Sequence, residues 1–546
     1  MLNIHQKYCR ETFYDGQLVG FEPVYQPDFN FAYDVVDVIA EKEPVRRAML
    51  WCNEAGEEHT FTFSEISKAS NRAANLFSSL GISRGDRVLL ILKRHYQFWF
   101  ALLGLHKLGA VGIPATNQLT KKDIAYRCNA AGIKAVICTT DGDVAEHVDT
   151  ALPECPTVEI KISVHGKHAD WVDFDKEYLK YSDEFKRVET LASDPMLIYF
   201  TSGTTGMPKM VCHDFTYPIA HIVTAKYWQN VVPDGLHLTI SDTGWMKSMW
   251  GKLYGQWFME AGIFVCDFDR FHAEQILPLF AKYQITTFCA PPTMYRFFIK
   301  EDLSKYDLSS LQHASIAGEP LNPEVFNQFY KATGLRLMEG FGQSETTLLL
   351  YNPVGTKPKP GSTGRPNPCY AVDLVDAQGR TVPTGEVGEI VVRTDKGKPV
   401  GLFDGYYRDE ERTRSAWHDG IYHTGDTAWQ DEDGYFWYIG RNDDIIKSSG
   451  YRIGPFEIES VLMEHPAVLE CAITGVPDPI RGQVVKATIV LSRGYEASDE
   501  LKKELQNYVK KQTAPYKYPR IIDFVAELPK TISGKVRRVE IRGGMD

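Results

Sequence analysis

The sequence predicts an α/β protein of two domains, as three changes of pattern along its 546 residues indicate. From about residue 60 to 300, helical and strand patterns alternate, which is typical of parallel sheets with crossover helices. Between 361 and 440, short β segments are joined by Gly and Asp turns, as in a compact β subdomain. After Arg441 an independent α/β module of roughly a hundred residues follows. We therefore expect an N-terminal domain at 1–441 and a C-terminal domain at 442–546.

The alternating region repeats a helix followed by a short apolar strand. The stretch 63–82 is amphipathic, with Ser64 as the expected N-cap and Gly81 at its end. The apolar stretch 86–92 is a strand, and a helix then runs through Leu108. Further helix–strand pairs are expected at 121–133 with 134–140, and at 273–285 with 286–292.

Composition and charge exclude several classes of protein. The chain is 43% hydrophobic and 24% charged, as in soluble globular proteins, and its net charge of −11 disfavours nucleic acid as the main partner. His106 and Lys107 interrupt the most apolar run, 98–115, so we expect a buried helix and strand there and no membrane span. The N-terminus has no apolar signal region, and ten Cys without a C-x-x-C pair indicate free thiols in a reducing cytoplasm.

A Gly-rich stretch, YFTSGTTGMPKMV at 199–211, follows a buried apolar run. Backbone N–H groups at Gly203 and Gly206 can point at an anion, and the Thr and Ser hydroxyls add donors. The stretch is not a Walker A loop, because two residues separate Gly206 from Lys209. Alone, it is equally well explained as a polar linker. Other segments have to decide between a phosphate loop and a connector.

Four further segments accompany this loop: EGFGQSETT (339–347), YHTGD (422–426), GRNDDIIKSSGYRIGPFEIE (440–459) and LPKTISGKVRR (528–538). In order and spacing, the five segments resemble those of the AMP-forming acyl- and aryl-CoA synthetases, the adenylate-forming enzymes. The resemblance runs from about residue 30 to the C-terminus. FNFAYDVVD, SDTGWMK, GEPLNPEV, GYRIGPFE and TAPYKYPR are similar to the medium-chain acyl-CoA synthetase subfamily.

The resemblance implies a fold and a reaction. The fold has a large N-terminal domain of two α/β sheet subdomains and a β-barrel-like subdomain, and a small mobile C-terminal α/β domain. The reaction is a ligation in two steps: a carboxylic acid and ATP form an acyl-adenylate and pyrophosphate, and the thiol of CoA then displaces AMP. ATP, the acid and CoA are the implied substrates, and Mg²⁺ is the implied cofactor.

The resemblance also implies the nucleotide site. Thr204 and Thr205 are the hydroxyl donors to pyrophosphate, Phe341 lies on adenine, and Glu339 receives the adenine amino group. Asp426 and Arg441 bind the ribose hydroxyls. The implied ATP- and AMP-binding residues are Thr201, Ser202, Gly203, Thr204, Thr205, Gly206, Lys209, Gly318, Glu319, Pro320, Glu339, Gly340, Phe341, Gly342, Gln343, Ser344, Asp426, Arg441, Arg452 and Lys535. Ser344 departs from the Thr that is common in the family and keeps its hydroxyl.

Three residues are implied to act in catalysis: Lys535, Thr204 and Glu345. The Lys535 ammonium would bridge the attacking carboxylate and the α-phosphate, and Glu345 would hold Mg²⁺. Acetylation of Lys535 would remove its charge and regulate the enzyme. Taken singly, each has a simpler explanation: a basic tail for Lys535, a surface carboxylate for Glu345. Likewise, Asp426 could start a turn and Arg441 could form a surface ion pair.

The CoA half-reaction is implied to use a second face of the C-terminal domain. Asp443 matches the family's hinge, and rotation there would bring this face to the active site. Gly450 leaves room for pantetheine because it has no side chain. The implied CoA-binding residues are Gln118, Ser449, Gly450, Tyr451 and Arg481.

The acid is indicated by Gly342 and Trp245. Short-chain acetyl-CoA synthetases carry Trp at the position of Gly342, so an open pocket and a medium-chain, branched or aryl acid are expected. Trp245 is the expected pocket wall, although a Trp in the core is the simpler alternative. A short-chain CoA ligase, an adenylation enzyme with another acceptor, and a nucleotide-binding module without catalysis remain as alternatives. A panel of acids with ATP and CoA distinguishes them.

Overall fold

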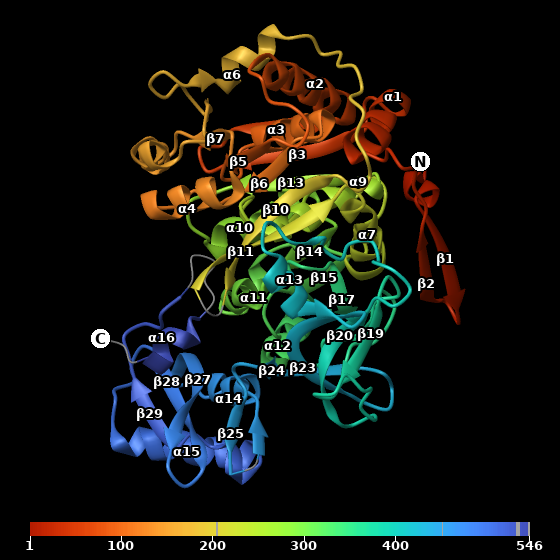
Figure 1. Ribbon diagram of the computed structural model, residues 1–546. Helices are drawn as coiled ribbons and strands as arrows, with labels where there is room; N and C mark the ends of the chain where they lie inside the picture. Colours follow the sequence, from red (N-terminus) through yellow and green to blue (C-terminus); the bar gives the residue numbers. More distant parts are fainter. Residues whose placement is uncertain (204–205, 450, 531–535, 544–546) are drawn as a thin grey trace.

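The computed structural model describes residues 1–203, 206–449, 451–530 and 536–543. Two large mixed sheets form the body of the molecule, and the C-terminal module lies at one end of it (Figure 1). A hairpin of β1 (Cys9–Tyr14) and β2 (Gln17–Pro23) stands at the side of the body (Figure 1). The α/β architecture expected from the alternating pattern is confirmed.

The first large sheet has eight strands in the order β21-β11-β10-β6-β5-β7-β8-β9. From β10 to β9 the neighbours are parallel, and β11 and β21 are added antiparallel at the other edge. The strands are β5 (Arg87–Ile91), β6 (Val111–Pro114), β7 (Ala135–Thr139), β8 (Ile160–Val164), β9 (Val172–Asp173), β10 (Pro195–Gly203), β11 (Gly206–Asp214) and β21 (Gly405–Tyr406).

The second large sheet has nine strands in the order β18-β17-β16-β15-β14-β12-β13-β3-β4. Its six central strands are parallel, so their carboxyl ends lie at one edge, where ligands bind in sheets of this kind. The strands are β3 (Arg47–Asn53), β4 (Glu58–Thr62), β12 (Leu236–Thr239), β13 (Gly262–Asp267), β14 (Thr287–Ala290), β15 (His313–Ala317), β16 (Leu337–Gly342), β17 (Leu348–Tyr351) and β18 (Arg365–Pro366).

Helices connect and cover these strands. In chain order they are α1 (Val38–Lys42), α2 (Phe63–Ser79), α3 (Gln97–Leu108), α4 (Lys121–Ala131), α5 (Val144–Ala151), α6 (Phe174–Glu177), α7 (Tyr217–Val223), α8 (Met246–Gly251), α9 (Tyr254–Phe258), α10 (Ala273–Tyr283), α11 (Pro292–Phe298), α12 (Pro323–Thr333), α13 (Glu410–Ala416), α14 (Pro455–Met463), α15 (Asp499–Gln512) and α16 (Arg538–Gly543).

The N-cap of helix α2 lies two residues before the expected one. Thr62 is the N-cap, because its hydroxyl accepts the Glu65 backbone N–H at 3.3 Å and the Glu65 carboxylate accepts the Thr62 backbone N–H at 2.8 Å. This reciprocal pair satisfies two free donors of the first turn, so the expectation of Ser64 as N-cap is wrong. Gly81 ends the segment with φ of 89°, as expected.

Helix α3 explains the apolar run at 98–115. Every residue of the helix is buried, and it packs so closely on α2 that a Cβ on Gly104 would lie 3.0 Å from Ala73. The Lys107 ammonium is also buried and donates to Asp37 at 2.8 Å. The helix is therefore part of the core, and none of the described helices is long and apolar enough to cross a bilayer.

The β subdomain expected between 361 and 440 is a five-stranded antiparallel sheet. Its order is β19-β20-β23-β22, and β24 pairs with β23. The strands are β19 (Ala371–Val375), β20 (Val387–Arg393), β22 (Trp417–His418), β23 (Ile421–Gln430) and β24 (Phe436–Arg441).

The C-terminal module has its own sheet, in the order β26-β25-β28-β27 with β29 parallel to β28, and its own core under α14 and α15. The strands are β25 (Ile446–Ser448), β26 (Tyr451–Ile453), β27 (Val468–Asp478), β28 (Gly482–Leu491) and β29 (Ile521–Phe524). The chain changes sheets between Arg441 and Ile446, next to the expected boundary. The module is packed closely on the body, since a Cβ on Gly454 would lie 2.4 Å from the Ile439 carbonyl oxygen.

Candidate active site

The Gly-rich stretch is the tip of the β10–β11 hairpin. The pair is antiparallel, with Thr201 opposite Lys209 and Gly203 opposite Gly206. Thr204 and Thr205 lie outside the described residues. The described parts of the stretch, 199–203 and 206–211, thus lie in two paired strands of a large sheet, which is the setting expected for a phosphate loop.

Tyr406 joins the hairpin to Glu345. The Lys209 ammonium donates to the Tyr406 hydroxyl at 3.3 Å and lies 4.9 Å from the centre of the tyrosine ring. The same hydroxyl donates to Glu345 Oε1 at 2.8 Å. Burial lowers the pKa of Lys209, while the Glu345 carboxylate raises it. A carboxylate, an ammonium and a phenol thus meet beside the hairpin tip.

Sequence reasoning missed Tyr406. It lies in β21, which pairs with β11 so that Val211 stands opposite Tyr406. The segment around it, DGYYRDEER, carries no motif, and the long separation between β11 and β21 leaves no local signal. Only the sheet pairing brings this residue to the site.

Gln343 holds Asp426 in place. Its amide nitrogen donates to Asp426 Oδ2 at 2.5 Å and to the Thr424 carbonyl at 2.8 Å. The Tyr422 hydroxyl donates to the Gln343 amide oxygen at 2.7 Å. Asp426 is only 4% exposed and lies inside β23, so it does not start a surface turn. Its carboxylate is an acceptor that Gln343 orients.

Arg441 stands directly opposite Asp426 in the β23–β24 pair. Its guanidinium also contacts Asp443, with 3.2 Å between Nε and Oδ1, so the ion pair expected in the simpler explanation is present too. The Tyr438 hydroxyl donates to Asp426 Oδ1 at 2.9 Å, and its ring lies 5.8 Å from that of Phe341. Burial and the Asp426 carboxylate raise the pKa of Tyr438 well above its usual value.

Glu339 points into the interior. It is 4% exposed, and Oε1 accepts the Leu321 backbone N–H at 3.4 Å, while Oε2 has no hydrogen-bond partner among the described residues. Burial raises its pKa well above the usual range. The turn that follows β15 needs a glycine at position 318, because the φ of Gly318 is 107°. A Cβ at this position would lie 3.1 Å from the Lys247 ammonium. In the same turn, Glu319 accepts the Thr293 hydroxyl at 3.2 Å, and Pro320 follows.

Gly342 has a structural reason to lack a side chain. A Cβ there would lie 2.2 Å from the Thr347 carbonyl oxygen, because β16 pairs with β17 so that Gly342 stands opposite Leu348. The absence of a side chain therefore does not by itself measure the pocket. Gly340 is crowded as well, with Trp228 2.8 Å from a Cβ. Trp245 is partly exposed and precedes α8, so it is not a core tryptophan.

Of the described residues that are expected to bind CoA, three lie together and one lies apart. Ser449 donates its backbone N–H to the Arg481 carbonyl at 2.9 Å, and the Arg481 guanidinium donates to the Ser449 hydroxyl at 3.2 Å. Tyr451 is half exposed and stacks on Tyr516, with ring centres 4.0 Å apart. Gln118 follows β6, a strand of the eight-stranded sheet, and its side chain is exposed. It does not belong to this cluster. Gly450 lies outside the described residues.

Lys535 also lies outside the described residues, but the chain on both sides of its segment is held. Lys530 and Val536 form an antiparallel bridge. Arg538 contacts both Glu459 oxygens at 2.8 Å, and Asp444 at 3.4 Å. Arg452 stands opposite Lys447 in the β25–β26 pair. The chain after Lys535 is thus tied to the residue that follows the expected hinge, Asp443.

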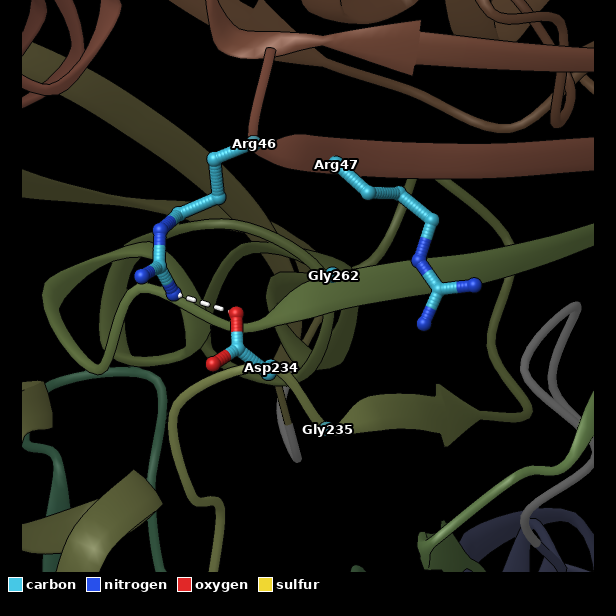
Figure 2. A pocket seen from close by; sticks show the side chains of 5 residues that line it. All are labelled: Arg46, Arg47, Asp234, Gly235 and Gly262. Atoms are coloured by element: carbon cyan, nitrogen blue, oxygen red, sulfur yellow. Dashed lines mark hydrogen bonds and ion pairs between the residues drawn. The ribbon is translucent and has the colours of Figure 1, made fainter. Parts of the chain in front are cut away.

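A cavity near the other edge of the nine-stranded sheet is separate from this site. Its volume is about 220 Å³, and Arg46 contacts Asp234 at 2.7 Å on its wall (Figure 2). It lies where β3, β12 and β13 begin, whereas Phe341 and Gly342 end β16 at the opposite edge. It takes no part in the arrangement described above.

Comparison with known proteins now decides the family. Residues 36–407 match the family model described as AMP-binding enzyme, and residues 457–535 match the AMP-binding enzyme C-terminal domain. The chain belongs to the AMP-binding enzyme family. Acyl-coenzyme A synthetase ACSM3 of Mus musculus is 44% identical over 94% of this chain and 90% of its own length. For ACSM5 of Homo sapiens the identity is 43%, with the same coverage.

Solved structures of this family have the same fold. The anthranilate CoA ligase AuaEII in complex with anthranoyl-AMP has a TM-score of 0.86 at 27% identity, covering 95% of this chain and 98% of that chain. A benzoate CoA ligase from Burkholderia xenovorans LB400 has a TM-score of 0.82 at 26% identity, covering 94% and 100%. The expected adenylate-forming fold, with large N-terminal and small C-terminal parts, is confirmed.

The expected cytoplasmic location is wrong on this comparison, because both ACSM relatives are named as mitochondrial. All ten cysteines are free, nine of them buried, as expected. Free thiols show only that a compartment is reducing, however, and do not distinguish one reducing compartment from another.

Proposed function

We propose that this AMP-binding enzyme is an acid–thiol ligase that activates a medium-chain, branched or aryl acid with ATP and transfers it to CoA. The observation that carries the proposal is the convergence of Asp426, Arg441 and Glu345 beside the β10–β11 hairpin. The relatives that are named acyl-coenzyme A synthetases support the same reaction.

The first half-reaction joins two anions. A carboxylate oxygen attacks the α-phosphorus, and the bond to the bridging oxygen breaks so that pyrophosphate leaves with its electron pair. Oriented donors at the hairpin, with Lys209 beside them, would take up the charge on the leaving group. The Asp426 carboxylate and the Arg441 guanidinium match the donor and acceptor needs of two ribose hydroxyls. Phe341, which lies against Tyr438, offers a ring face to the base.

Mg²⁺ would be held by Glu345 together with the phosphates of ATP. The donor set fits, because Glu345 supplies a hard oxygen ligand and Mg²⁺ keeps phosphate and water for its other positions. When bound, the ion neutralises phosphate charge. Tyr406, by donating to Oε1, fixes the orientation of this carboxylate.

The second half-reaction would use the C-terminal module. CoA sulfur attacks the acyl carbonyl of the adenylate, and AMP leaves with the electron pair of the broken C–O bond. Lys535 would serve the first step, and the cluster of Ser449, Tyr451 and Arg481 would bind CoA in the second. In Figure 1, β25 lies at the end of the module away from the large sheets, so a rotation about Asp443 is needed to bring this cluster to the adenylate.

The test is a panel of acids with ATP and Mg²⁺, with and without CoA. We expect pyrophosphate release that depends on the acid, and acyl-CoA formation when CoA is added. Release of pyrophosphate without thioester would indicate another acceptor. No release with any acid would leave a nucleotide-binding module without catalysis and would contradict the proposal.

A further inference from the structure

A cluster of two histidines and an aspartate lies at the edge of the eight-stranded sheet. His95 follows β5, Asp141 follows β7, and His165 directly follows β8. These strands are parallel neighbours in the order β5-β7-β8, so their carboxyl ends place the three side chains together. One ligand atom from each residue lies within 4.8 Å of the other two.

The distances within the cluster are those of groups that face a common point. His165 Nδ1 lies 2.6 Å from Asp141 Oδ1, and His95 Nε2 lies 3.4 Å from Asp141 Oδ2. The two imidazole rings have centres 4.6 Å apart. Asp141 therefore turns one oxygen to each histidine.

The second nitrogen of His95 is held by a carboxylate from the other large sheet. His95 Nδ1 lies 2.9 Å from Asp267 Oδ2, and both side chains are nearly fully buried. Histidines that bind metals donate their other ring N–H to such a carboxylate, which directs the remaining nitrogen at the ion. Here that nitrogen, His95 Nε2, lies 2.8 Å from the Thr139 hydroxyl, so a bound ion would replace this contact. The contact with Asp267 is independent of the three ligands and is the feature that singles out the cluster from an ordinary ion pair.

Access from solvent is open. A cavity of about 340 Å³ is lined by Lys93, Asn117, Asp141, Gly142 and Asp269, and His165 is half exposed. An ion can therefore enter at Asp141 and keep a water molecule as a further ligand.

We propose that His95, Asp141 and His165 bind a divalent transition-metal ion, Zn²⁺ in preference to Mg²⁺, at a site separate from that of ATP. Two imidazole nitrogens and one carboxylate oxygen with a water suit Zn²⁺, whereas Mg²⁺ favours oxygen ligands alone. Because the ligands come from three strand ends, the bound ion clamps these ends together.

One group competes with the ion. The Lys93 ammonium lies 3.2 Å from Asp141 Oδ2, and it also contacts Asp269 at 2.7 Å. When a cation occupies the site, the ammonium keeps its contact with Asp269. Removing the ammonium should therefore strengthen metal binding.

The segment that carries His95 is hydrogen-bonded to the loop that carries Trp245, so an ion bound at His95 would also influence that loop. Thr243 donates its hydroxyl to the Lys93 carbonyl, and Arg94 contacts Asp242 at 3.3 Å. These bonds connect the segment that carries His95 to the one that carries Trp245.

The test is equilibrium dialysis of the full-length, untagged protein against Zn²⁺ with Mg²⁺ in excess, followed by measurement of bound zinc. We expect one ion per chain. Loss of the ligand in His165→Ala should weaken binding by at least the roughly 10- to 100-fold that loss of an outer-shell partner costs. Lys93→Met should bind more tightly. Visible absorption of the Co²⁺-loaded protein reports the ligand geometry without any use of catalysis.

The matched control is His168→Ala. His168 contacts Asp149 at 2.7 Å and resembles the cluster as a histidine–aspartate pair, but it is not part of it. Its loss should leave zinc binding unchanged. Asp141→Asn serves as a second ligand variant, and circular dichroism confirms that each variant is folded. Absence of stoichiometric zinc, or equal binding by His165→Ala, Asp141→Asn and the wild type, overturns the proposal.

Discussion

The Tyr406 hydroxyl donates a hydrogen bond of 2.8 Å to Glu345, across two segments that no sequence motif connects. The same oxygen accepts the Lys209 ammonium at 3.3 Å. One phenol therefore sets the distance between the hairpin lysine and the carboxylate that is proposed to hold Mg²⁺.

Tyr406→Phe should weaken adenylation at low Mg²⁺. A hydrogen bond to a charged group contributes about 1.5–3 kcal/mol, so we expect kcat/KM for Mg²⁺–ATP to fall about tenfold or more. Pyrophosphate release measured against Mg²⁺ concentration checks this, with partial recovery at high Mg²⁺. Tyr407→Phe, one residue on, is the control and should behave as the wild type. Equal activity of both variants would show that Tyr406 contributes packing and does not orient the Glu345 carboxylate.

Lys535→Ala should abolish adenylate formation and leave the second half-reaction largely intact. Its charge is needed when carboxylate and phosphate approach, but thioester formation from supplied acyl-adenylate does not bring these anions together. Single-turnover assays of the two steps measure this directly. Equal loss of both steps would contradict the assignment. Acetylated Lys535 should be inactive in the same step.

Gly450→Leu should still form adenylate and fail to form thioester. The side chain would obstruct pantetheine in the cluster of Ser449, Tyr451 and Arg481, without contact to ATP. Pyrophosphate release in the absence of CoA is the internal control. Normal thioester turnover would exclude the proposed second face.

The wild type should prefer hexanoate, octanoate or benzoate over acetate. Each buried methylene adds about 0.8 kcal/mol, so kcat/KM should differ at least tenfold. Gly342→Trp, the substitution that the sequence suggests, would first collide with the Thr347 carbonyl oxygen, 2.2 Å from the added Cβ. Trp245→Ala is the better probe, and it should change the ranking of acids while the KM for ATP stays constant. A wild type that prefers acetate would refute the medium-chain and aryl assignment.

Stability should fall when the pH drops below about 6.5. Burial lowers the pKa of His106 and His237 to about 3, and mainly burial lowers that of His213 and His313 to about 4. Above 6.5 these groups are neutral in both states. Below pH about 6.5 these histidines bind protons in the unfolded chain but not in the folded one. The free energy of unfolding therefore falls until the pH reaches the pKa values of the folded state.

Each such histidine lowers the free energy of unfolding by about 1.4 kcal/mol for every pH unit in that interval. The midpoint of thermal unfolding, followed between pH about 7 and about 5, measures the sum. His313→Gln keeps a donor for the Trp228 carbonyl and should reduce the slope. His418→Gln, at an exposed position, should not.

The sequence by itself determined the family, the α/β alternation and most element positions, because these depend on local period and on ordered motifs. The apolar stretch 86–92 became β5 (Arg87–Ile91), and the helix expected to run through Leu108 became α3 (Gln97–Leu108). Even here, a local detail was lost: Thr62 and not Ser64 caps α2, since the reciprocal bond with Glu65 stabilises the earlier start.

Only the tertiary structure decided which distant residues meet. Tyr406 reaches Glu345 through the pairing of β21 with β11, and His95, Asp141 and His165 meet because β5, β7 and β8 are parallel neighbours. Strand pairing joins residues without regard to their separation along the chain, so a pattern that depends on local period cannot contain this information.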